Sequence, residues 1–182
     1  MRIAETGMSG VYVIEHTYHK DLRGEFFKVF NGALFREAGL VTDFREAFHS
    51  TSVKNVIRGM HFQVPPHDHE KLVYTSHGCV LDVVVDIRPD SSTYGQYFAT
   101  ELSAENRKSI YIARGFAHGF RVLSDSATVH YMTSTEHHAE SDRGILWNSF
   151  GCDWRLKGID DDPVLSDRDR SFPGLENFDS PF

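Results

Sequence analysis

Short runs of β-branched and aromatic residues recur along most of the chain, with turn-forming residues between them. Apolar and polar positions alternate over 10–19, and a turn centred on Gly24 precedes a second apolar run over 25–31. Such short alternating or apolar runs, bounded by turns, indicate β-strands. Eight more segments of this kind follow, at 47–53, 56–63, 71–78, 79–88, 94–103, 108–115, 117–124 and 127–135.

Three segments depart from this alternation. Leu34, Phe35 and Ala38 have helical spacing within 31–40, and Gly39 is placed to end a short helix there. The run from Val80 to Val85 is almost continuously apolar, which is typical of a strand buried on both faces. After Trp154 the sequence turns acidic and irregular.

Many short strands at regular spacing, without alternating helices, predict an all-β fold: a double-sheet jelly roll, which is a cupin-like barrel. The expected additions are one short N-terminal helix and an irregular C-terminal segment. The chain has no internal repeat and no linker-like tract, so we interpret residues 1–182 as a single domain.

The composition of the chain argues against several classes of function. A formal charge of −7 argues against nucleic-acid binding, which depends on clustered Lys and Arg. The chain contains no apolar run of 18 residues, and its N-terminus lacks a signal-peptide core, so we expect a cytoplasmic protein that does not contact a membrane. Cys79 and Cys152 lie far apart in sequence, and we expect both to be reduced thiols.

The stretch RGMHFQVPPHDHEKLV, residues 58–73, gathers three histidines around two prolines. His67 and His69 form an HxH pair, which would place two rings on one face of a strand, as a metal site requires. Glu70 is adjacent and would point away, and adding His118 as a later ligand still leaves no convincing carboxylate. The prolines also favour a loop, so we do not expect a metal site here.

Acid/base chemistry fits the same stretch better. His61 lies in a strand-like run three residues after Arg58, whose fixed charge suits a phosphate or a carboxylate. Lys71 begins the next strand, where an ammonium group can stabilise a developing oxyanion. A histidine base gains from a carboxylate that holds its tautomer, and Asp167 and Asp169 in the acidic tail are candidates.

Taken together, the motifs resemble those of the dTDP-4-dehydrorhamnose 3,5-epimerase family. The resemblance covers nearly the whole chain in the same order. It implies a cupin-type jelly roll that works without metal or other cofactor, binds a nucleotide sugar and usually forms a homodimer. It is carried by DLRGEFFKVF, HSTSVKNVIRGMHFQVPP, KLV, GCVLDVVVDIR, STYGQYFATELSAEN, YIARGFAHGF, VHYMTS, GILWNS and LSDRD.

The resemblance also implies roles for individual residues. His61 would be the catalytic base, held by Asp169 of the SDRD motif. Tyr131 would be the acid that returns a proton to the opposite face, and Lys71 would stabilise the enolate oxygen. The implied substrate-binding residues are Arg23, Lys28, Glu46, Phe48, Arg58, His118, His137, Asp142 and Arg168.

Three departures from the family pattern concern ligand recognition. The chain has Lys28 where the family usually has Glu, and the segment Glu46-Ala47-Phe48 where it usually has Gln-Asp-Asn. It also has His137 where the family usually has a second tyrosine. These changes suggest retained proton transfer on an altered substrate, either a CDP- or GDP-linked sugar or inversion at C3 alone.

The main hypothesis is therefore an isomerase that epimerises a nucleotide-linked 4-keto-6-deoxy sugar at C3, C5 or both. Its product would be a deoxyhexose for a surface polysaccharide or a glycosylated metabolite. A 3,4-ketoisomerase and a non-enzymatic sugar-nucleotide-binding cupin are the competing classes. The full motif set favours an epimerase over the ketoisomerase, and the presence of Tyr131 and Asp169 disfavours the pure binding protein.

Overall fold

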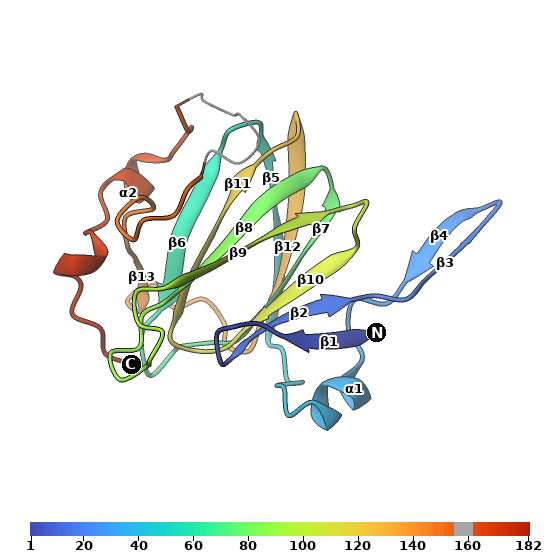
Figure 1. The fold of residues 1–182 in the computed structure, drawn as a ribbon, viewed down its shortest axis with the longest axis horizontal. Coiled ribbons are helices and arrows are strands. Elements are labelled where there is room, and N and C mark those ends of the chain that lie inside the picture. Colours follow the sequence, from blue (N-terminus) through green and yellow to red (C-terminus); the bar gives the residue numbers. More distant parts are fainter. Residues whose placement is uncertain (155–161) are drawn as a thin grey trace.

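The computed structural model describes residues 1–154 and 162–182, and two antiparallel sheets dominate it (Figure 1). The larger sheet has six strands in the order β1 (Arg2–Glu5), β2 (Val11–Glu15), β10 (Lys108–Ile112), β7 (Lys71–His77), β12 (Ser126–Thr133) and β5 (Glu46–Val53). The smaller has five, in the order β13 (Asp142–Gly144), β6 (Ile57–Gln63), β11 (Phe116–Val122), β8 (Cys79–Asp86) and β9 (Tyr97–Ser103). The predicted all-β jelly roll is confirmed.

All eight strand segments predicted between residues 47 and 135 form strands, β5 to β12. The prediction for 10–19 was wrong, because the strand breaks after Glu15. The chain then enters a separate hairpin of β3 (Tyr18–Asp21) and β4 (Gly24–Phe27), which projects away from both sheets (Figure 1). We call this hairpin the arm. Strands β1 and β13 were not predicted, since each is too short to show a period.

The predicted N-terminal helix is present as α1 (Gly32–Glu37). The side chain of Asn31 caps it by accepting from the backbone N–H of Ala33 at 3.1 Å, and Gly39 follows it with φ of +72°. That left-handed conformation is one that glycine adopts easily, which explains where the helix ends. The C-terminal segment is less irregular than predicted, because it contains α2 (Asp167–Arg170) and a short 3₁₀ turn (Leu175–Asn177).

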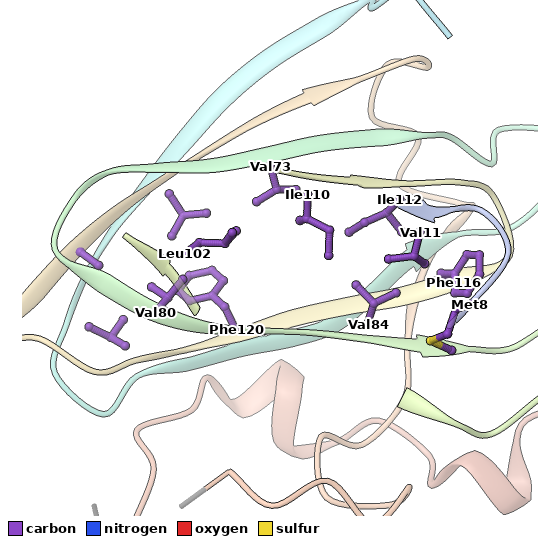
Figure 2. Close-up of a cluster of buried hydrophobic side chains, with 13 residues drawn as sticks. Met8, Val11, Val73, Val80, Val84, Leu102, Ile110, Ile112, Phe116 and Phe120 are labelled. Atoms are coloured by element: carbon purple, nitrogen blue, oxygen red, sulfur yellow. The ribbon is translucent and has the colours of Figure 1, made fainter. Parts of the chain in front are cut away.

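Side chains from both sheets meet in one apolar core, as Figure 2 shows. Val80 and Val84 of β8 belong to this core, whereas Leu81, Val83 and Val85 belong to a second cluster on the other face of the same strand. C-terminal side chains, including those of Leu175 and Phe178, pack on that second cluster. Strand β8 is therefore buried on both faces, as its continuous apolar run predicted.

Two further observations bear on the expectations from composition. No disulfide joins Cys79 and Cys152. Within residues 1–154 and 162–182, every helix is too short and too polar to cross a membrane.

Strand β6 gains one residue relative to its neighbour β11, and this irregularity shapes the site. His61 pairs with His118 and Arg58 pairs with Phe120, so two steps on β11 match three on β6. Residues three apart on a regular strand point to opposite faces. The extra residue lets Arg58 and His61 line the same cavity.

Two glycines make the crossing of β6 and β11 possible. Gly59 has φ of +129°, and a Cβ there would lie 2.6 Å from Cα of Gly119. A Cβ on Gly119 would lie 2.7 Å from Sδ of Met60 and 2.8 Å from the carbonyl oxygen of Arg58. Neither position has room for a side chain.

We therefore expect Gly119→Ala to lower the free energy of unfolding by about 1–3 kcal/mol, the usual cost of overpacking a filled interior. Denaturant titration would measure the loss. Gly7→Ala is the matched control, because a Cβ on Gly7 has no neighbour within 4 Å among the described residues. Equal stability of the two variants would contradict the prediction.

Candidate active site

A cavity lined by both sheets brings most of the predicted site residues together. The six-stranded sheet contributes side chains from β5, β7 and β12, and the five-stranded sheet contributes side chains from β6, β11 and β13. The predicted residues that line it are Glu46, Phe48, Arg58, His61, Lys71, His118, Tyr131, His137, Asp142 and Arg168.

The imidazole of His61 is held by a carboxylate from α2. Its Nε2 lies 2.9 Å from Oδ1 of Asp169, and the other oxygen of Asp169 accepts from the backbone N–H of Gly59 at 3.1 Å. Burial acts to raise the pKa of Asp169, but hydrogen bonds from His61 and Gly59 outweigh it and lower this pKa. An ionised carboxylate only accepts, so Nε2 carries a proton, and in the neutral ring Nδ1 is the acceptor. His61 is thus prepared to receive a proton at Nδ1.

Tyr131 lies on β12, in the sheet opposite to that of His61. Its ring stacks on Phe48 of β5, with centroids 4.8 Å apart and planes 13° apart, and meets the ring of His118 edge-on at 6.0 Å. Burial raises the pKa of Tyr131, so the phenol keeps its proton. The cavity therefore has a proton donor on one wall and a proton acceptor on the other.

The two walls also contain a buried ammonium group, Lys71 of β7, and a second histidine–carboxylate pair, His118 of β11 with Asp82 of β8. Nζ of Lys71 donates to the carbonyl oxygen of His61 at 3.0 Å. Burial lowers the pKa of Lys71 to about 8, while Asp142 and Asp82 act to raise it. Nε2 of His118 lies 2.8 Å from Oδ2 of Asp82, and both side chains are almost fully buried. The pair with Asp82 fixes the orientation of the His118 ring.

Charged groups gather at one side of the cavity. A guanidinium nitrogen of Arg168 lies 2.7 Å from Oδ2 of Asp142, and Nε2 of His137 lies 3.3 Å from the same oxygen. Glu46 accepts from the backbone N–H of His137 at 2.8 Å. Arg58 donates from Nε to Oγ of Ser52 at 2.9 Å, which leaves its other nitrogens to bind an anion.

Two predicted binding residues do not line this cavity. Arg23 lies in the turn of the arm, where its side chain is 89% exposed and pairs with Asp21 at 2.6 Å. Lys28 follows β4 at the base of the arm and is also exposed. Of the recognition changes noted in the sequence, Ala47 also points elsewhere, since Glu46 and Phe48 on either side of it line the cavity.

The loop from 64 to 70 was predicted correctly, and its two histidines diverge. The ring of His67 stacks on that of His138 with centroids 3.4 Å apart, and its Nδ1 lies 3.0 Å from Oγ of Ser141. His69 instead lines the cavity and contacts Gln63. Across residues 1–154 and 162–182, no three His, Cys, Asp or Glu side chains are grouped to hold a metal ion.

Sequence reasoning missed several residues of the cavity. Phe62 and Gln63 belong to the same motif as His61, so proximity was a usable signal. Thr133 lies two residues from Tyr131 on the same strand, and strand periodicity places it on the same face. Ser50 follows Phe48 by the same rule, whereas Thr135 lies outside the strands and carried no such signal. His69 was considered only as a metal ligand of the HxH pair, and its place in the cavity was not predicted.

A jelly roll whose cavity holds a carboxylate-bound histidine, an opposing protonated tyrosine and a buried lysine is equipped to move protons across a bound carbonyl compound.

A family model for dTDP-4-dehydrorhamnose 3,5-epimerase matches residues 5–177. The protein of that name from Escherichia coli (strain K12) is 43% identical over 173 residues, which are 93% of this chain and 91% of the relative. The one from Methanothermobacter thermautotrophicus is 41% identical over 176 residues, 96% and 94% of the two chains. The chain belongs to the dTDP-4-dehydrorhamnose 3,5-epimerase family and is a carbohydrate epimerase.

Solved structures agree with this membership. The dTDP-6-deoxy-D-glucose-3,5-epimerase from Legionella pneumophila, in complex with dTDP-4-keto-L-rhamnose, is similar with a TM-score of 0.92 and 35% identity, over 98% of this chain and 94% of that one. A 3'-monoepimerase from Streptomyces bikiniensis, in complex with dTDP-quinovose, has a TM-score of 0.89 and 29% identity, over 95% and 87%.

The environment of Lys71 predicts an unusual titration. Because burial disfavours the charged form, the amine of Lys71 should lose its proton near pH 8. Exposed lysines titrate at about pH 10.4. NMR of the lysine side chains across pH 6–11, with Lys71→Met to assign the signal, measures the midpoint. Asp142→Asn removes a carboxylate that raises this pKa, so the midpoint should fall further in that variant. Titration of Lys71 together with the exposed lysines would contradict this account.

Proposed function

We propose that the protein epimerises a nucleotide-linked 4-keto-6-deoxyhexose at C3, C5 or both, by proton transfer through an enolate. The placement of His61 and Tyr131 on opposite sheets carries this proposal. Inversion of a carbon requires a proton to leave one face and another to arrive at the opposite face. Two groups on facing walls satisfy that requirement, and two groups on one wall do not.

The reaction needs only groups that the cavity contains. A 4-keto group acidifies the protons on C3 and C5, and Nδ1 of His61 takes one of them. The electron pair of the broken C–H bond moves to the keto oxygen, whose negative charge the ammonium of Lys71 stabilises below about pH 8. The enolate then collapses and takes the phenolic proton of Tyr131 on its other face. Only protons move, so the overall change involves no oxidation or reduction.

Loss of the base should abolish this chemistry. In deuterated water, the parent enzyme should introduce deuterium at the inverted carbons, as followed by NMR. His61→Ala should lower the exchange rate by a factor of about 10²–10⁴, because a positioned base contributes that much. Binding of the nucleotide should stay within about tenfold of the parent, since the phosphates and base do not depend on His61. Exchange at the parental rate would remove His61 from the role.

Two companion variants separate the steps. Asp169→Asn should act on the same step more mildly, because it changes the orientation and charge of the base but leaves it in place. Tyr131→Phe should still allow exchange on the face of His61 while preventing inversion. Deuterium that enters without a change of configuration is therefore the expected signature of that variant.

A second candidate is inversion at C3 alone on a CDP- or GDP-linked sugar. Glu46, Phe48 and His137, the three recognition changes that line the cavity, support it. Phe48 supplies a stacking surface that any base can use, and one oxygen of Glu46 is free of the bond to His137, so that it can accept from an exocyclic amine. A structural relative described as a 3'-monoepimerase supports this candidate.

Calorimetric titration with four nucleoside diphosphates distinguishes the candidates. If the changed residues set the base preference, cytidine or guanosine diphosphate should bind more tightly than thymidine diphosphate, since cytosine and guanine carry the amine that thymine lacks. Deuterium at C3 alone should accompany that preference. Tightest binding of thymidine diphosphate, with deuterium at both carbons, would identify a 3,5-epimerase that acts on a dTDP sugar.

The proposal includes a homodimer, because apolar side chains of the arm stay exposed within one chain. Tyr18, Leu22 and Phe26 of the arm are large apolar residues with exposed side chains. Arg23 in the turn of the arm and Lys28 just after β4 do not line the cavity of their own chain. The arm itself projects away from both sheets (Figure 1). Docking of the arm on a second copy would bury its apolar residues and bring both cations to the cavity of that copy.

A mixing experiment tests this arrangement. His61→Ala and Arg23→Ala chains should each be inactive or weak alone. After denaturation and refolding together, mixed dimers should recover roughly a quarter of the parental activity, since half of the dimers are mixed and each contains one intact site. No recovery, or a protein that sediments as a monomer at micromolar concentration, would contradict the shared site.

A further inference from the structure

The ring of Phe172 contacts the imidazole of His61 without lining the cavity. The two ring centroids are 5.8 Å apart and their planes meet at 78°, which is an edge-to-face arrangement. Phe172 follows the end of α2 by two residues and is partly buried. Because His61 lines the cavity and Phe172 does not, the ring touches the proposed base from outside that space. None of the roles assigned above uses the phenyl group of Phe172.

A glycine provides the space that this ring occupies. Gly144 of β13 pairs with His61 of β6. Residues directly opposite each other on neighbouring strands share a face, so the missing side chain of Gly144 leaves room beside the imidazole. A Cβ on Gly144 would lie 2.3 Å from Cε2 of Phe172 and 2.5 Å from its Cζ. The phenyl ring therefore fills the place that a side chain at 144 would take.

The backbone is fixed on both sides of Phe172. Before it, Asp169 of α2 is bound to the imidazole of His61 at 2.9 Å. After it, the carbonyl oxygen of Pro173 accepts from the backbone N–H of Leu146 at 2.7 Å. The segment that carries the ring is thus tied at one end to His61 itself and at the other end to the chain just after β13.

The same ring also contacts Arg168, which lines the cavity. The guanidinium carbon of Arg168 lies 5.2 Å from the ring centroid of Phe172, within the range of a cation–π interaction. A guanidinium nitrogen of Arg168 pairs with Asp142 at 2.7 Å, yet the side chain of Arg168 is 49% exposed. A long, exposed side chain loses conformational entropy when it is held in one orientation. Contact with Phe172 restricts Arg168 before a ligand binds, so less entropy is lost on binding.

We propose that Phe172 is a positioning residue that acts through His61 and Arg168 at once. It supports the imidazole from outside the cavity and holds the guanidinium group at the cavity. The inference rests on the proposed function, since His61 and Arg168 act there on a bound nucleotide sugar. The apolar ring also excludes water from one side of the imidazole, and the hydrogen bond to Asp169 is stronger where water is excluded.

Two substitutions of Phe172 separate its two contacts. Phe172→Ala removes both, so we expect kcat to fall about 10–10²-fold, as when a reacting group is displaced by about 1 Å. KM should rise about two- to fivefold, because Arg168 loses its cation–π partner. Phe172→Leu keeps apolar bulk beside His61 but offers no π face to Arg168. Its kcat should return to most of the parental value, whereas its KM should stay raised.

A third substitution displaces the ring without altering it. Gly144→Ala places a Cβ where the ring of Phe172 lies, so its kcat should fall as in Phe172→Ala. Phe150→Ala is the matched control. Phe150 is also partly buried and meets another ring edge-on, that of Tyr97 at 6.1 Å, but neither residue lines the cavity. It should keep the parental kcat and KM, and an equal loss of kcat in Phe150→Ala would contradict a specific role for Phe172.

A double variant excludes a merely structural effect. If Phe172 acts on the chemical step through His61, it has little effect on that step once His61 is gone. In the His61→Ala background, Phe172→Ala should therefore lower the residual exchange at saturating substrate by less than about twofold, as followed over a long incubation. A further loss as large as that in the parent background would overturn the inference.

The inference and the proposed function fail in different ways. If the parent enzyme exchanges no deuterium into any nucleotide-linked 4-keto sugar, the proposed function is wrong. If the parent is active and Phe172→Ala is equally active, only the role of Phe172 is wrong.

Discussion

The carboxylate of Asp169 is the interaction on which the site depends. It accepts from His61 with one oxygen and from the backbone of Gly59 with the other, and Ser166 caps the short helix that presents it. One residue therefore joins the C-terminal segment to β6 and decides which nitrogen of His61 faces the cavity. Because the carboxylate is ionised and buried, it holds the imidazole in a single tautomer. The imidazole is oriented before any substrate arrives.

The irregularity in β6 has an equally direct effect on the chemistry. A regular strand would send Arg58 and His61 to opposite faces, one into the cavity and one into the second apolar cluster. The extra residue at Gly59 brings both side chains to the same face of β6, and Gly119 leaves room for it. The motif RGMH is thus a structural unit as well as a set of functional groups. Its glycine allows its arginine and its histidine to line the same cavity.

Much of the fold could be predicted because β6, β7, β8, β10 and β11 bury most of their side chains, and their sequences are accordingly apolar. The arm was predicted only in part. The turn at Gly24 and the run over 25–31 anticipated β4, which ends at Phe27, but β3 was merged with β2 into one strand over 10–19. Tyr18 and Phe26 are exposed, so their apolar character does not mark a buried face. Strand β13 is only three residues long and pairs with β6 through backbone contacts that leave no period in the sequence. The pattern of apolar and polar residues indicates which side chains are buried. The arm and β13 form without burying a regular set of side chains, so this pattern does not reveal them.

Most of the site residues implied by the family resemblance line one cavity, and geometry explains the exceptions. Ala47 lies between Glu46 and Phe48, and because successive side chains of β5 point to opposite faces, Ala47 points away from the cavity. Arg23 and Lys28 are attached to the arm, whose direction no local motif encodes. His69 was grouped with His67 as a loop residue, and only the contacts of Gln63 distinguish the two rings.

The placement of the proposed acid and the proposed base on different sheets has a consequence for how such enzymes diversify. The carboxylate that holds His61 comes from α2, whereas the ring that stacks on Tyr131 comes from β5. His118 of β11 contacts both residues, through strand pairing with His61 and through its ring with Tyr131. Substitutions on one wall can therefore alter how a proton is delivered while the other wall continues to remove it. A lineage can change the stereochemical outcome by drift on a single sheet, without passing through a form that has lost the ability to make the enolate.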